Sequence, residues 1–275
     1  MNEENEGLEN QDNEEWQAPP PPEKIEVEPK EEAQMSEVAT LGNIFFEPGR
    51  TFEDLKRKPR FILAFLIFAI LATAYTLVLN QKLGEDRIRR AAVEQAEKNP
   101  QFASLTEEQK AQSIDFGMTI TKVVTYALPV FLLLAFLIGA LIYWLGSKVM
   151  GGTTTFLQAL SVWVYSSFAP GVVSVLANLI VLIFKSPDDI DVATSGRGVI
   201  QANPSMLVGG KDMPVLTTII STIDLFAIWG LVIAAIGLAK VGKISKGSAW
   251  AIVLILTLLG ITMRVVGAFF NGVPS

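Results

Sequence analysis

The sequence predicts an all-α protein, a polytopic membrane bundle of five transmembrane helices preceded by a disordered acidic tail. Five apolar stretches of roughly 19 to 29 residues are each long enough to cross a hydrocarbon core of ~30 Å as a helix that rises ~1.5 Å per residue. Lipid offers no partner to an unpaired backbone group, so each stretch must be helical. The acidic and proline-rich segment before them has the composition of a disordered chain.

The acidic tail covers residues 1–40, which hold 13 Asp and Glu residues against Lys24 and Lys30. It contains a run of four prolines at 19–22 and one aromatic residue, Trp16. This composition buries too little apolar area to offset the chain entropy, so we expect disorder. Two uses remain open: a solubilising tether, or a docking arm for a basic partner with Trp16 as its anchor.

The chain contains no cysteine and no histidine. Their absence excludes a disulfide, a thiolate nucleophile, an imidazole base and a zinc site built from His and Cys. We therefore expect a protein that is not an enzyme and that carries no metal and no cofactor.

Residues 41–60, rich in aromatic and basic side chains, lead into the first span. We expect a helix in the membrane interface, capped by Thr51 and stopped by Pro59, with its basic side against anionic lipid head groups. The alternative is an ordinary positive flank of the first span. The residues assigned to the interface are Phe45, Phe46, Phe52, Lys56, Arg57, Lys58 and Arg60.

Between the first two spans, residues 84–122 predict a helical hairpin outside the membrane, with a capping box at Ser104 and Glu107. Residues 185–214, rich in Gly, Pro and Asp, predict a loosely ordered loop. The five spans are expected at residues 61–79, 123–145, 156–184, 215–239 and 248–270.

The third span is too long for an upright crossing, at ~43 Å if straight. Pro170 lies near its middle. Proline removes one hydrogen bond of the helix and clashes with the preceding turn, so we expect a kink at Pro170. Two re-entrant half helices are the alternative.

Asp224 in the fourth span and Arg264 in the fifth are ionisable residues within apolar stretches. In an antiparallel helix pair they lie at comparable depth, and pairing offsets the cost of ~2.5–3.5 kcal/mol for a charge in lipid. We therefore expect an Asp224–Arg264 ion pair. It serves either as a clamp between two helices or as a gated ion or proton site.

Small residues in the same two spans favour close helix packing. In the fourth span they form a seam that can pack inside the core or against a second copy of the chain, which leaves a homo-oligomer open. The residues assigned to packing are Gly230, Ala234, Gly237, Gly260 and Gly267.

Basic residues collect before the first span and in the turn at 240–246 after the fourth. Five spans place both segments on the same side of the membrane. Positive residues favour the cytoplasmic side of short loops. We therefore expect the N-terminus in the cytoplasm and the C-terminus outside.

Three short motifs stand out along the chain. They are Phe45-x-x-Pro48 with Phe52, Leu55 and Pro59, the Leu-x-x-x-x-Tyr-Ser run at 160–166 before Pro170, and Asp224-Leu-Phe-Ala-Ile-Trp229 followed by Gly237-Leu-Ala239. These motifs resemble those of the prokaryotic members of the Yip domain family, the Ypt-interacting protein type of five-span membrane domain. The likeness covers about residues 41–270.

The resemblance implies a non-enzymatic protein of the bacterial inner membrane, a scaffold or adaptor in membrane organisation or a trafficking-like process. Eukaryotic relatives are associated with small GTPases, but their Asp-Leu-Tyr-Gly-Pro segment is absent here, so GTPase binding is not expected. Expected partners are anionic lipids at the basic segment and an unidentified membrane or cytoplasmic protein, with no nucleic acid. The alternative is a small transporter or channel subunit that uses Asp224 and Arg264.

Overall fold

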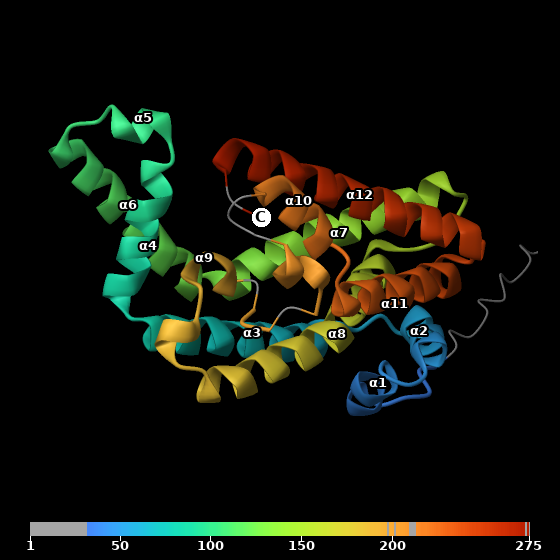
Figure 1. Cartoon of the computed structure of the whole chain (residues 1–275). Helices are drawn as coiled ribbons and strands as arrows, with labels where there is room; N and C mark the ends of the chain where they lie inside the picture. The colour runs from blue at the N-terminus through green and yellow to red at the C-terminus, as the bar shows by residue number, and fades with distance from the viewer. Residues whose placement is uncertain (1–31, 197, 201, 209–212, 273, 275) are drawn as a thin grey trace, which may run out of the picture. The chain divides into compact units, whose positions relative to one another are not determined.

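A computed structural model of the chain describes residues 32–196, 198–200, 202–208, 213–272 and 274. Every regular element in these residues is helical, and five of the helices are long and apolar enough to cross a membrane (Figure 1). The prediction of an all-α polytopic bundle is therefore confirmed. The predicted disorder of the tail before residue 32 lies outside the described residues.

The five membrane helices keep the predicted order along the chain. α3 runs one turn beyond the predicted first span, and α8 has the predicted bounds. α7 begins five residues later than expected, because Pro129 occupies its first turn. The backbone N–H groups of a first turn have no acceptor within the helix, so a proline, which has no N–H group, is favoured there. The bounds are α3 Ile62–Leu83, α7 Leu128–Val149, α8 Phe156–Phe184, α11 Leu225–Gly242 and α12 Lys246–Asn271.

The predicted fourth span, residues 215–239, is wrong in its first third. A separate helix, α10 (Pro214–Ser221), precedes α11. Asp224 lies at the break, and its side chain accepts hydrogen bonds from the backbone N–H groups of Phe226 and Ala227. A side-chain oxygen in this position starts a helix. The helix therefore breaks at Asp224, although the sequence around the break stays apolar.

α8 is the central helix of the bundle and packs against α3, α7 and α11. A capping box of Thr155 and Gln158 begins it. Pro170 lies inside one continuous helix of 29 residues, so two half helices are not the arrangement found. The kink at Pro170 stays a prediction.

Two glycines allow aromatic rings to approach the backbone of a neighbouring helix. A Cβ atom at Gly139 of α7 would lie 2.3 Å from the ring of Trp163 on α8. A Cβ atom at Gly171 of α8 would lie 2.4 Å from the ring of Phe68 on α3. Both contacts belong to a hydrophobic core to which all five membrane helices contribute.

The hairpin between α3 and α7 consists of α4 (Glu85–Glu97) and α6 (Glu107–Tyr126), joined through the short α5 (Pro100–Ala103). Ion pairs join Glu85 to Lys122 at 2.9 Å and Arg89 to Asp115 at 2.6 Å. From the first ion pair to the second, the residue number increases in α4 and decreases in α6. The two helices therefore run antiparallel.

The capping box of α6 lies two residues beyond the predicted one. The Thr106 hydroxyl accepts from the backbone N–H of Gln109, and the Gln109 side chain accepts from the backbone N–H of Thr106. Ser104 and Glu107 have the same spacing, but the Ser104 hydroxyl donates to a carbonyl of α5. The prediction of Ser104 as the cap is therefore wrong.

The loop after α8 is held to the bundle at two polar contacts. The Tyr75 hydroxyl of α3 donates to the Ser195 carbonyl at 2.8 Å, and the Asn178 side chain of α8 accepts from the Ile200 N–H at 2.8 Å. The described parts of this loop are thus fixed against α3 and α8 rather than loosely ordered. Its short helices are η1 Pro187–Asp189, α9 Val192–Ser195 and η2 Pro204–Leu207.

Two short helices precede α3, namely α1 (Glu37–Asn43) and α2 (Pro48–Arg57). α1 begins inside the predicted tail, so the tail boundary at residue 40 is too late. α2 packs against α11 and α8. Within residues 32–275, α1 and α2 lie at the end of the bundle opposite to α4, α5 and α6 (Figure 1).

Candidate functional site

A cavity of about 400 Å³ lies between α8, α11 and α12 at the break before α11. We call it the break cavity. Both ionisable residues that the sequence singled out, Asp224 and Arg264, line it. Its polar lining is Ser174, Asn203, Ser221, Thr222, Asp224, Thr257 and Arg264.

Asp224 is fixed by the first turn of α11. Its Oδ1 accepts from Phe226 N at 2.9 Å and from Ala227 N at 3.1 Å, and its Oδ2 accepts from Asn203 Nδ2 at 3.4 Å. The N-terminal end of a helix carries a partial positive charge, which stabilises a carboxylate there. The carboxylate is thus held at the cavity wall by neutral groups.

Arg264 reaches the same cavity from α12. Its Nη2 donates to the Ser221 hydroxyl at 3.1 Å, and that hydroxyl donates in turn to the Thr218 carbonyl at 2.7 Å. Ser221 is the last residue of α10, so this contact ties α12 to the helix before the break.

The predicted ion pair between Asp224 and Arg264 stays a prediction. The sequence placed Asp224 inside an unbroken fourth span, whereas it lies at the break before α11, where its carboxylate accepts from the amide groups of that helix. Both charged side chains line the same cavity.

Capping by Asp224 predicts how its variants behave. Asn caps a helix about as well as Asp, whereas Ala cannot. We expect Asp224→Ala to lower the free energy of unfolding by about 1 kcal/mol and Asp224→Asn to leave it nearly unchanged. Unfolding of both variants in mixed micelles measures this. An equal loss in both would show that the charge matters rather than the cap, as a direct ion pair with Arg264 requires.

The small-residue seam of α11 is covered by the same chain. A Cβ atom at Gly230 would lie 3.2 Å from the Ser166 carbonyl of α8. One at Gly237 would lie 2.8 Å from Val162 of α8 and 2.9 Å from the ring of Phe52 on α2. Ala234, between the two glycines, is buried. The seam therefore lets α8 and α2 approach the backbone of α11.

The predicted glycines of α12 have a different setting. A Cβ atom at Gly260 would meet no other residue within 4 Å, and this glycine lines the break cavity. Gly267 is half-buried. Gly260 thus provides open space beside Arg264 rather than a close helix contact.

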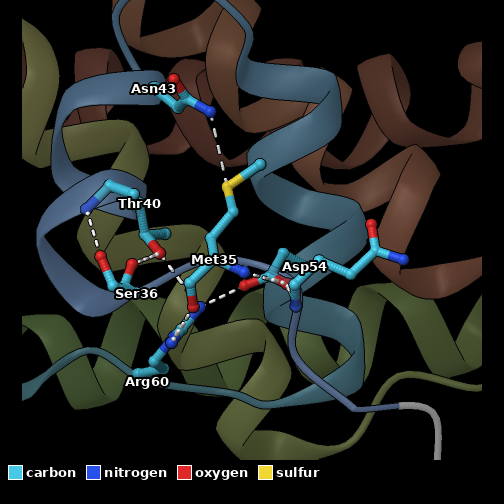
Figure 2. A network of polar contacts seen from close by, with 8 residues as sticks. Met35, Ser36, Thr40, Asn43, Asp54 and Arg60 are labelled. Carbon is cyan, nitrogen blue, oxygen red and sulfur yellow. Dashed lines mark hydrogen bonds and ion pairs between the residues drawn. The ribbon is translucent and has the colours of Figure 1, made fainter.

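A second polar cluster surrounds a buried ion pair beside α1 and α2 (Figure 2). Asp54 of α2 pairs with Arg60, which follows α2, and their side chains are 2% and 10% exposed. Asp54 Oδ1 also accepts from the backbone N–H groups of Gln34 and Met35. Arg60 donates to the Met35 carbonyl at 2.8 Å and to the Thr40 hydroxyl at 3.0 Å. We call these residues the root network.

The root network joins residues 34–40 to the membrane domain. The Thr40 hydroxyl donates to the Ser36 carbonyl at 2.7 Å, and the Ser36 hydroxyl caps α1 (Figure 2). The sequence analysis did not single out Asp54. The local sequence contains no signal for its burial, because positions one and two residues apart, such as those of Leu55 and Phe52 relative to Asp54, point to different faces of a helix.

The predicted interfacial helix is packed on protein. Phe52 and Leu55 are 0% exposed and belong to the core, so the predicted place of Phe52 in the membrane interface is wrong. The ring of Phe45 contacts the rings of Phe168 and Trp229, at centroid distances of 6.1 and 6.0 Å. Phe46, 86% exposed, is the aromatic residue of this segment that faces outwards.

The basic residues of the same segment divide into two groups. Arg60 is largely buried in the root network, so its predicted place among the head groups is wrong. Lys58 is exposed, and Lys56 and Arg57 are half-buried. These three residues form the basic edge of α2. Anionic lipid head groups therefore remain a proposed partner of this edge.

An ion pair between Glu53 and Lys240 connects α2 to the last turn of α11. The hydrogen bond and the charge of Lys240 lower the pKa of Glu53 below its ordinary 4.5. A depressed carboxyl pKa contributes stability above the unfolded-state value, and this is lost as the pH falls through the folded-state pKa.

We therefore expect Glu53→Gln to destabilise the protein slightly at pH 7, by less than ~1 kcal/mol because the pair is half exposed. The difference between wild type and variant should vanish at pH 3. Parallel unfolding of both proteins at the two pH values measures it. A difference that grows on acidification would contradict the assignment.

Five apolar helices with charged groups only at their ends and in one cavity define an integral membrane protein. Among the ranges that the structure describes, no group of three or more Asp, Glu, His or Cys residues could hold a metal ion. The chain belongs to the Yip1 family, because the model of the Yip1 domain matches residues 42–267. The family resemblance seen in the sequence is confirmed.

A curated relative is the "Membrane protein YknW" of Bacillus subtilis (strain 168). It is 27% identical over 252 residues, which cover 90% of this chain and 97% of the relative. No solved structure matches. The family and the relative support an integral membrane protein, in agreement with the five helices.

Proposed function

We propose that this protein is a non-enzymatic adaptor of the bacterial inner membrane. The five helices anchor the chain, and the acidic segment before residue 32 recruits a basic protein partner at the cytoplasmic surface. The observation that carries the proposal is the root network, in which buried Asp54 and Arg60 fix residues 34–40 to the bundle. Residues 34–40 are therefore fixed to the membrane domain.

The orientation rests on the distribution of basic residues. Lys56, Arg57 and Lys58 precede α3, and Lys240, Lys243 and Lys246 surround the turn between α11 and α12. The Glu53–Lys240 pair brings these two segments together at one end of the bundle. Basic residues in short loops favour the cytoplasm, and they also attract anionic lipid head groups.

Co-purification tests the adaptor proposal. The full-length chain and a chain lacking residues 1–31 are isolated from native membranes in mild detergent. The deletion stops before Gln34, because a deletion to residue 40 would remove the root network. A matched control keeps the length of the segment but replaces its acidic residues with Gln and Asn.

We expect a protein partner at near-stoichiometric yield with the full-length chain, and its loss with both variants. Loss with the deletion but not with the neutral segment would show that charge does not recruit the partner. Equal yields from all three chains, or no specific protein in any sample, would contradict the adaptor proposal.

A small transporter or channel subunit is the second candidate, and the break cavity supports it. Asp224 and Arg264 line this cavity within the membrane part of the chain. Asp224→Asn keeps the helix cap and removes the charge. A solute flux in wild-type proteoliposomes that this folded variant abolishes would favour a transporter over an adaptor.

A further inference from the structure

We propose that one face of α6 lies against the adjacent leaflet of the membrane, so that the hairpin rests on lipid and does not stand free in water. The face is defined by the exposed apolar side chains of Phe116, Ile120 and Val123, and we call it the α6 stripe. Its partner is the interface of a phospholipid bilayer. The proposal goes beyond the adaptor function and does not depend on it.

The α6 stripe lies on a helix that already has a buried face. Ile114 and Met118 of α6 are buried in a small cluster with residues of α4. Phe116, Ile120 and Val123 point elsewhere and are 67%, 44% and 53% exposed. Exposed apolar side chains gathered on one face are typical of a contact with a membrane or with another protein. The stripe therefore indicates a second apolar contact of the hairpin.

The stripe continues into the lipid-facing surface of α7. Backbone hydrogen bonds from Ala127 N to the Val123 carbonyl and from Phe131 N to the Ala127 carbonyl keep the helical spacing across the junction of the two helices. Residues three or four positions apart therefore share one face from α6 into α7. The exposed apolar residues of α7 on this face are Val130, Phe131, Leu134, Ile138, Leu141 and Leu145. Continuity with a surface that lies in lipid favours lipid over a protein as the partner.

The distribution of charge on α6 also fits a membrane interface. Asp115 and Lys122 lie beside the stripe and form ion pairs with α4. An interfacial helix buries an apolar face and keeps its charged groups towards water. The other positions that share the face of the stripe are all uncharged, namely Gln109, Gln112, Ser113, Thr119 and Ala127. Polar residues thus replace apolar ones with increasing distance from α7, as head groups replace hydrocarbon.

The direction of the hairpin permits this contact. Phe116 lies about 15 Å of helix before the end of α6 at Tyr126, whereas the head-group layer is only about 5–8 Å thick. An upright α6 would therefore carry Phe116 into water. Within residues 32–275, α4 and α6 are turned away from the direction of α3, which crosses the membrane (Figure 1). An inclined α6 keeps the stripe near the lipid surface.

Spin labels on single cysteines test the proposal, since the chain has no cysteine of its own. The full-length protein, in nanodiscs of phosphatidylethanolamine and phosphatidylglycerol, carries one label at Phe116→Cys or at Ile120→Cys. EPR power saturation measures how often each label collides with oxygen, which concentrates in lipid, and with a nickel chelate, which stays in water. Leu134→Cys on α7 is the lipid reference, and Lys98→Cys is the water reference. Thr121→Cys, exposed on another side of α6, is the matched control.

We expect the ratio of oxygen to nickel collisions at positions 116 and 120 to shift from the water reference towards the lipid reference, and the ratio at position 121 to stay near the water reference. Ratios at 116 and 120 equal to the water reference would overturn the proposal. Rare collisions with both reagents would also overturn it, because a second copy or another protein would then cover the stripe. A lipid-like ratio at 121 as well would contradict a contact made by one face.

Discussion

Replacing Asp54 with alanine is expected to lower the free energy of unfolding by about 3–5 kcal/mol, the largest effect of a single substitution considered for this chain. The variant leaves the guanidinium of Arg60 buried without its carboxylate, and it removes the acceptor of the Gln34 and Met35 N–H groups. An unpaired buried charge costs more than the ion pair contributed, which is why one substitution is so damaging.

Removal of both charges provides the control. The double variant Asp54→Leu, Arg60→Leu replaces the pair with apolar side chains, and we expect it to recover most of the loss. Unfolding in mixed micelles measures stability, and limited proteolysis measures whether residues 34–43 become accessible. A loss below about 1 kcal/mol for Asp54→Ala, or an equal loss for the double variant, would contradict a buried and mutually dependent pair.

Replacing Gly139 with alanine is expected to cost about 1–3 kcal/mol of stability. The new Cβ atom would lie within 2.3 to 2.5 Å of three ring atoms of Trp163. The ring cannot move aside freely, because it is in edge-to-face contact with Tyr143 at a centroid distance of 4.7 Å. The variant must therefore push α7 away from α8.

Gly117→Ala in α6 is the matched control, since a Cβ atom there would meet no other residue within 4 Å. Alanine is favoured over glycine inside a helix by about 0.5–1 kcal/mol, so this variant should be more stable than the wild type. The two identical chemical changes thus have opposite expected signs. Thermal denaturation that shifts both midpoints in the same direction would refute the packing of Gly139 against Trp163.

The membrane helices were predictable because each corresponds to a long apolar run. Inside lipid such a run forms a helix, since a helix pairs its own backbone polar groups. The breaks at Pro129 and Asp224 were harder to predict, since the surrounding composition stays apolar. Both still had local signals. A proline favours the first turn of a new helix, and an Asp directly before an apolar run is a helix-cap signature.

The two polar clusters show why only one was found from the sequence. Asp224 and Arg264 stand out because an ionisable residue is rare in an apolar stretch. Asp54 and Arg60 lie in a segment full of charges, and composition does not tell which of them is buried. Their burial depends on the packing of α2 against α8 and α11, which brings together parts of the chain distant in sequence.

The same reason explains the error in the tail boundary. Residues 37–43 directly follow the acidic segment, and a helix as short as α1 is not stable by itself. Its place depends on Ser36, which caps it, and on the contacts of Thr40 with Arg60. Ser36 directly precedes the helix, but Arg60 lies 20 residues beyond Thr40, so the local sequence contains only one of the two partners.

The most direct test of a cytoplasmic adaptor is the side of the membrane on which the root network lies. The chain has no cysteine, so Lys98→Cys in the exposed hairpin and Lys246→Cys at the start of α12 each carry a single thiol. A membrane-impermeant maleimide is applied to spheroplasts before and after permeabilisation. We predict labelling of the thiol at 98 in intact spheroplasts and of that at 246 only after permeabilisation. Labelling of the thiol at 246 in intact spheroplasts, with the one at 98 protected, would place the root network outside and contradict a cytoplasmic adaptor.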